Sequence, residues 1–97
     1  MKTYVVLRRN GWKSVQELEK AAARSTHVGR SEMPGQVRWL RSYVTPEHGG
    51  GVGTVCVYQA TDPDAVREHA RRADLPCDEV IPVSEVVIVN ADEPVTA

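Results

Sequence analysis

The sequence predicts an α+β domain of the ferredoxin-like type, in the order strand, helix, strand, strand, helix, strand. Stretches rich in β-branched and aromatic residues alternate with two stretches of helical periodicity. The 97 residues, 41% hydrophobic and 26% charged, suit one globular domain with one core. Right-handed crossovers turn this order into an antiparallel sheet with both helices on one face. An extra terminal strand segment and a dimeric α/β-barrel-type assembly complete the predicted fold class.

The first half of the chain predicts a strand, a helix and a second strand. TYVVLRR at 3–9 has strand composition and is followed by the turn-forming pair Asn10-Gly11. A helix is expected over 14–29, because Ser14 and Glu17 have the spacing of a capping box. VRWLRSYVT at 37–45 has the composition of the second strand.

The second half repeats the pattern after a glycine-rich hairpin. TVCVYQA at 54–60 predicts a strand, and the following helix is expected to run over 62–76, with Thr61 or Asp62 as its cap and Pro63 in its first turn. The last strand is expected over 79–90, broken near Pro82 because proline cannot donate in a central ladder. We therefore expect one domain over residues 1–90 and a polar C-terminal tail over 91–97.

Composition argues against several classes of partner. Twelve basic and 13 acidic residues give a formal charge of -1, so no general attraction to nucleic acid is expected. No apolar run approaches the roughly 20 residues of a membrane span, and the N-terminus lacks a signal-peptide core. Cys56 and Cys77 lack the spacing of a disulfide framework, so we expect free thiols and a cytoplasmic protein.

Side-chain alternation divides the strand residues into two sets. We expect an aliphatic set to face the helices: Val5, Leu7, Leu40, Val44, Val55 and Val57. We expect a mixed set to line the open face: Tyr4, Val6, Arg8, Trp39, Arg41, Tyr43, Cys56 and Tyr58. That face is too apolar to leave in water and suits a homodimer interface, a small-molecule pocket between two sheets, or both. In such a pocket Arg41 or Arg8 would counter an anionic substrate.

His69 falls on the apolar arc of the second helix. One interpretation is a buried, neutral imidazole that makes a hydrogen bond to backbone or to a tyrosine hydroxyl. The other is a metal ligand or a general acid/base, since imidazole suits nickel and proton transfer. Alternation places Cys56 on the opposite side of the sheet from His69, so one metal held by both within one subunit is not expected.

The remaining candidates lie at the surface or beside arginines. Glu47 and His48 could chelate weakly in the hairpin, or form a solvated tip, and a partner subunit or water would have to complete the ligand set. His27 is expected to face solvent on the first helix. Cys56 is either a packed strand residue or, beside Arg8 or Arg41, a soft ligand or nucleophile. No catalytic constellation is evident.

Three stretches, VRWLRSYV, CVYQATDPDAVREHARRADLP and DEVIPV, resemble a family of small bacterial proteins known mainly as a domain of unknown function. Its namesake is described as a nickel-binding protein. The resemblance runs from about Tyr4 to Val83 and implies a ferredoxin-like homodimer with nickel at the dimer surface. The sequence departs from the family at Leu7, where members often have Glu, and at Arg41, where an acid can precede Ser-Tyr. The strongest signals are Ser42-Tyr43, Cys56-x-Tyr58-x-Ala60 and Arg67-Glu68-His69-Ala70 before Leu75-Pro76.

Three functional hypotheses follow. The first is a nickel-binding or nickel-responsive protein, whose candidate metal ligands are His69, His48, Glu47 and His27. The alternative is a dimeric barrel that binds or transforms a small organic molecule on the open sheet face. The third is an interaction scaffold without a ligand.

Overall fold

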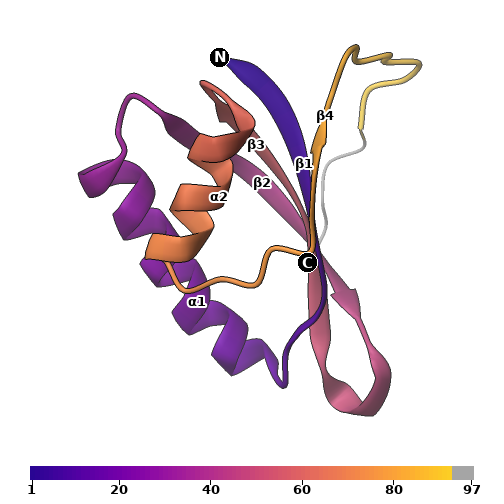
Figure 1. Ribbon diagram of the computed structural model, residues 1–97. Helices are drawn as coiled ribbons and strands as arrows, with labels where there is room; N and C mark the ends of the chain where they lie inside the picture. The colour runs from indigo at the N-terminus through magenta and orange to yellow at the C-terminus, as the bar shows by residue number, and fades with distance from the viewer. Residues whose placement is uncertain (93–97) are drawn as a thin grey trace.

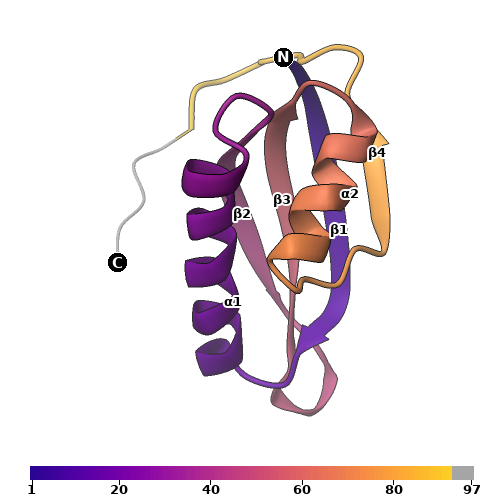
Figure 2. The ribbon, with the colours of Figure 1, turned by 60° about the vertical axis from the view of Figure 1, so that its left-hand side comes forward.

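The computed structural model describes residues 1–92 as two layers, with both helices on one face of a four-stranded antiparallel sheet (Figure 1 and Figure 2). The sheet has the order β2-β3-β1-β4. This arrangement confirms the predicted ferredoxin-like fold. The strands are β1 (Lys2–Trp12), β2 (Val37–Pro46), β3 (Val52–Ala60) and β4 (Glu79–Pro82); the helices are α1 (Val15–His27) and α2 (Pro63–Arg72), with a π-helical turn η1 (Val28–Glu32) and a 3-10 turn η2 (His48–Gly50).

Both helices begin at the predicted caps. The Ser14 hydroxyl accepts a hydrogen bond from the Glu17 amide at 3.3 Å, and the Asp62 carboxylate accepts one from the Ala65 amide at 2.8 Å. Helix α1 ends differently from the prediction, because the chain widens into η1, where the Met33 amide donates to the Val28 carbonyl at 2.9 Å. Neither helix of residues 1–92 has the length and apolar character to cross a membrane.

Strand β2 contains a bulge that the sequence analysis did not predict. Its pairing with β3 shifts between Trp39 and Arg41, so that Leu40 is the extra residue. Trp39 lies opposite Tyr58 on β3, and Tyr43 opposite Val55. Trp39 and Tyr43 therefore lie on opposite faces of the sheet, and the expectation that both line one face was wrong.

The assignment of the mixed set to the open face was also wrong. The helices cover Tyr4, Val6, Arg8, Cys56 and Tyr58, each at most 3% exposed. Alternation defines two sets of side chains but not which set the helices cover. The stripe of α1 that faces the sheet has small residues (Ala21 and Ser25 are buried), which leaves room for large aromatic side chains opposite. His69 and Cys56 consequently lie on the same side of the sheet, contrary to the expectation.

The open face is aliphatic instead. No helix or strand of residues 1–92 packs over it, and Arg41 and Tyr43 are exposed there, as expected. Its centre consists of half-buried residues from three adjacent strands: Val5, Leu7, Val55, Val57 and Ile81.

The last predicted strand is shorter than expected. The Val83 amide donates to the Thr3 carbonyl at 2.9 Å, after which the chain leaves the sheet on the side away from the helices (Figure 1). Because β1 begins at Lys2, no strand remains for later residues to pair with. Val86–Val89 are consequently 68–83% exposed. Of the predicted polar tail over 91–97, residues 93–97 lie outside the described part of the chain.

Candidate functional site

A line of polar side chains crosses the interior between the helices and the sheet. The Cys56 sulfur on β3 accepts hydrogen bonds from Arg8 Nη1 on β1 at 3.2 Å and from the Ser42 hydroxyl on β2 at 2.9 Å. Trp39 Nε1 donates to the Ser42 hydroxyl at 2.7 Å. The β2 bulge makes this arrangement, because it places Ser42 opposite Cys56 and turns Trp39 to the same face. Two donors therefore converge on one buried sulfur atom.

Arg8 is the largest side chain that is almost fully buried, at 1% exposure. Its Nε donates to the Pro76 carbonyl at 2.6 Å, and its guanidinium carbon lies 5.8 Å from the centre of the Tyr58 ring. No carboxylate of residues 1–92 forms an ion pair with it, and Nη2 has no hydrogen-bond partner. A buried cation with so few compensating contacts is costly for stability.

His69 occupies the centre of α2 at 1% exposure. Its Nε2 lies 3.1 Å from the Ser25 carbonyl oxygen, so the ring donates this hydrogen bond. The imidazole and the Tyr58 ring meet edge to face, with their centroids 5.4 Å apart. Burial lowers the pKa of His69; the hydrogen bond to Ser25 opposes this effect, and the Arg8 charge adds to it. The imidazole is thus held neutral, with Nδ1 buried and without a partner.

An apolar groove of about 280 Å³ lies between α1 and strands β2 and β3. Cys56 and Thr54 form part of its sheet wall, and the Thr54 hydroxyl is buried without a hydrogen-bond partner. A larger hollow of about 810 Å³, lined by Arg30 and Arg38 among others, lies near the π turn and the start of β2 and does not include Cys56. The rest of the groove is mostly apolar and includes Trp12, Val15, Leu18, Ala22, Trp39, Val44 and Leu75.

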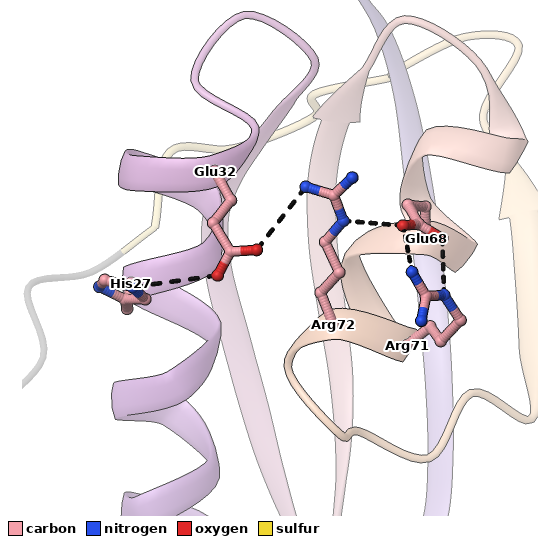
Figure 3. A network of polar contacts seen from close by, with 5 residues as sticks. All are labelled: His27, Glu32, Glu68, Arg71 and Arg72. Atoms are coloured by element: carbon pink, nitrogen blue, oxygen red, sulfur yellow. Dashed lines mark hydrogen bonds and ion pairs between the residues drawn. The ribbon is translucent and has the colours of Figure 1, made fainter.

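The surface contains a second polar network, which includes His27 (Figure 3). His27 Nε2 lies 3.9 Å from Glu32 Oε2, and Glu32 Oε1 lies 3.6 Å from Arg72 Nη1. Arg72 also pairs with Glu68, whose pKa falls to about 2 because Arg71 and then Arg72 donate hydrogen bonds to it. The sequence analysis missed Glu32, because an α-helical period does not place residues five apart together, whereas the π turn does.

Glu47, a candidate ligand together with His48, is hydrogen-bonded to residues of β1. Arg9 Nε and Nη2 donate to the Glu47 carboxylate at 2.9 and 3.2 Å, and the Asn10 amide donates at 3.3 Å. These donors lower the pKa of Glu47 and tie it to β1, whereas His48 begins the turn η2. The Glu47 carboxylate therefore links the hairpin to β1 through Arg9 and Asn10 instead of pairing with the neighbouring His48.

No group of three or more His, Cys, Asp or Glu side chains in residues 1–92 could hold a metal ion. His69 is buried on α2, His27 has one carboxylate neighbour and His48 lies in the hairpin. Nickel takes about four to six ligands, so water or a second subunit would have to complete a site built on these residues.

Comparisons with known proteins agree with the fold. A family model described as "Nickel responsive protein SCO4226-like" matches residues 4–83. The crystal structure of SCO4226 from Streptomyces coelicolor A3(2) superimposes with a TM-score of 0.71 at 19% sequence identity, covering 88% of this chain and 99% of that chain. No curated protein matches this chain significantly. At this identity the structural similarity establishes the fold alone.

Proposed function

The chain belongs to the SCO4226-like family of nickel responsive proteins, and from this membership we propose that it binds Ni²⁺ in a metal-responsive role. The residues that best support this proposal are the exposed pair His27 and Glu32, whose Nε2 and Oε2 atoms lie 3.9 Å apart. An imidazole and a carboxylate at this separation need only a small rotation to share one ion. Water molecules or the second subunit of a dimer would supply the other ligands.

Arg72 limits the affinity of such a site for Ni²⁺. Its guanidinium lies 3.6 Å from Glu32 and would repel an incoming cation. Glu68 holds Arg72 from the other side with an Nε–Oε2 distance of 2.7 Å. Nickel binding therefore requires Arg72 to leave Glu32 while it keeps its contact with Glu68.

We expect calorimetric titration of the untagged, metal-free protein to show Ni²⁺ binding that depends on both members of the pair. His27→Ala and Glu32→Gln should each weaken binding by at least the roughly tenfold that loss of a supporting group costs at metal sites. Arg72→Gln should strengthen it, because it removes the competing charge. Titrations with Zn²⁺ and Co²⁺ measure selectivity.

His48→Ala is the matched control, since it removes an exposed imidazole away from the pair. The proposed site would be wrong if His27→Ala bound nickel as tightly as the wild type. Nickel binding that persists without His27, His48 and His69 would exclude imidazole ligation altogether.

We further propose that the protein is a homodimer in which the open aliphatic face packs against a second copy, giving a dimeric α/β-barrel assembly. Val5, Leu7, Val55 and Val57 form the centre of this face, and one twofold axis makes such a patch complementary to itself. The exposed segment Val86–Val89 leaves the sheet on the same side and lies beyond the family match at 4–83. Four adjacent exposed aliphatic residues favour burial against the partner.

The free thiols also favour a reducing, cytoplasmic location.

Val57→Lys is expected to weaken the dimer, because it puts a charge at the centre of the open face that the dimer would bury. Sedimentation velocity over a concentration series should show at least a tenfold increase in the dimer dissociation constant, about 1.4 kcal/mol. Ala23→Lys on the exposed side of α1 should leave the constant unchanged. A wild-type protein that sediments as a monomer at every concentration would contradict the dimer.

A further inference from the structure

Seven of the nine exposed large hydrophobic side chains of residues 1–92 lie in two parts of the chain. One part is the edge strand β2, where Leu40, Tyr43 and Val44 are exposed. The other is the segment Val86–Val89, which follows β4 and lies outside the sheet. Apolar side chains gathered at the surface in this way indicate an interaction surface.

The same two parts have unpaired backbone groups. Strand β2 pairs with β3 on one side alone, and residues 38–46 make no further backbone hydrogen bond within residues 1–92. Beyond the Val83 amide, the described part of the segment makes no backbone hydrogen bond either. An edge strand with free N–H and C=O groups is a ready template for another strand.

The geometry of β2 limits where a strand can be added. The bulge at Leu40 interrupts the regular register, and Pro46 has no N–H to donate. Residues 41–45 between them leave room for five paired residues. The stretch 86–90 has the same length, and its first four residues are β-branched, which favours a strand.

The charges of the two parts are complementary. Arg38 and Arg41 are the charged residues of β2, and neither forms an ion pair with a carboxylate of residues 1–92. Glu85 and Asp92 flank the segment on its two sides, and both are exposed and likewise unpaired in this part of the chain. Basic β2 therefore suits the acidic flanks of the segment.

A second copy of the chain is the partner that this arrangement favours. Strands β4 and β2 are opposite edges of the sheet, so the segment begins at the edge farthest from its own β2. It is directed away from the sheet on the side of the open face, where the proposed dimer places the other subunit (Figure 1). A twofold axis that runs along the strands places β4 of one copy over β2 of the other.

We propose that residues 86–90 of each copy add to β2 of the second copy as a fifth strand beside residues 41–45. The two subunits thus exchange their C-terminal segments. This inference rests on the proposed dimer and adds hydrogen-bonded edges to its packed faces. Glu85 and Asp92 then lie near the arginines of the other copy's β2.

A proline scan of residues 86–89, followed by sedimentation velocity, tests the strand pairing. Alternate residues of a paired strand donate to their neighbour, and proline cannot donate. We therefore expect proline to raise the dimer dissociation constant roughly tenfold or more at two alternate positions and much less at the other two. Ala91→Pro, just past the paired residues, is the matched control and should leave the constant unchanged. None of these residues belongs to the core, so each variant is expected to keep the subunit fold.

Hydrogen exchange distinguishes strand pairing from packing of side chains alone. Alternate amides of residues 86–90 should exchange roughly tenfold or more slowly in the dimer than in the Val57→Lys variant at a concentration where that variant is monomeric. Alternate amides of residues 41–45 should show the same difference. Protection that persists in the monomer would assign the segment to its own β2 and would overturn the exchange.

Charge reversal tests the choice of β2 as the acceptor. Arg38→Glu together with Arg41→Glu should weaken the dimer by about threefold, and Glu85→Lys together with Asp92→Lys should do the same. Combining all four substitutions should restore the wild-type dissociation constant, because the charges are again opposite. A combined variant weaker than either pair would contradict this contact.

The exchange is overturned if proline is tolerated at all four positions, or if the segment amides are unprotected in the dimer. If Val57→Lys weakens the dimer under the same conditions, the packing of the open faces stands and only the exchange fails. A wild-type protein that is monomeric at every concentration refutes the dimer and the exchange together.

Discussion

Replacing Arg8 with methionine is expected to raise the free energy of unfolding by about 1–2 kcal/mol, unusual for a residue so completely buried. The guanidinium loses its hydration on folding and regains two hydrogen bonds and one contact with the Tyr58 ring, with no carboxylate of the described chain beside it. Methionine keeps much of the chain length and fills the same space without a charge. The loss of the bond to the Pro76 carbonyl offsets part of the gain.

Urea unfolding of three variants separates charge from packing. Arg8→Ala should lower stability by about 2–4 kcal/mol, because it leaves a cavity where a long side chain was. Arg8→Lys should also be less stable than the wild type, because it keeps a charge and loses the planar fork. If Arg8→Met proves as unstable as Arg8→Ala, the guanidinium stabilises the fold, and the argument that its buried charge is costly fails.

An arginine kept at a cost in stability is typical of a functional position. The surroundings support this interpretation, since the Cys56 sulfur, the Thr54 hydroxyl and the groove lie on the same side of the sheet. The sequence analysis considered Cys56 beside either Arg8 or Arg41 and expected all three at an open sheet face. The structure places Arg8 and Cys56 under the helices, where the same residues act in a much less solvated setting.

The architecture was predictable because its signals are local. Ser14 and Asp62 cap the two helices as their sequence positions indicate, and the strand composition fixed the element order. The choice of the covered sheet face was not predictable from alternation. It depends on how the volumes of the strand side chains match the helix stripes, and the small residues Ala21 and Ser25 on α1 favour the aromatic set.

The details of the site depend on two local irregularities. The β2 bulge at Leu40 brings Trp39 and Ser42 to the Cys56 side, and no turn or proline in the sequence marks it. The π turn after His27 brings Glu32 next to the imidazole. Both irregularities insert one residue into a regular period, so any analysis that assumes strict alternation or 3.6 residues per turn assigns the wrong neighbours.

His69 is expected to make the protein less stable as the pH falls below about 6.5, the ordinary pKa of histidine. Burial lowers the pKa of His69 in the folded state, so the folded protein holds a neutral ring while the unfolded chain takes up a proton. The stabilisation is fully present above the unfolded pKa and decreases as the pH falls through it. One such group can change stability by at most about 1.4 kcal/mol per pH unit.

The groups around the ring act in both directions: the Arg8 charge also lowers the pKa of His69, and the hydrogen bond to the Ser25 carbonyl raises it against the larger effect of burial. Arg8 from β1 adds a positive charge that disfavours protonation, and Ser25 from α1 and Tyr58 from β3 contribute no carboxylate to oppose it. Glu68, at the surface, titrates in a separate window: its folded pKa of about 2 gives a contribution that is lost as the pH falls from about 4.5 toward 2. The interval between pH 4.5 and 6.5 therefore reports mainly on histidine.

Denaturant unfolding at several pH values across this interval tests the effect. His69→Gln should have a flatter profile than the wild type, because it keeps a polar side chain and removes the titration. Equal slopes for His69→Gln and wild type would show that His69 is not the group responsible. The unpartnered Nδ1 would then have to be reconsidered as the site of a proton already present in the folded state.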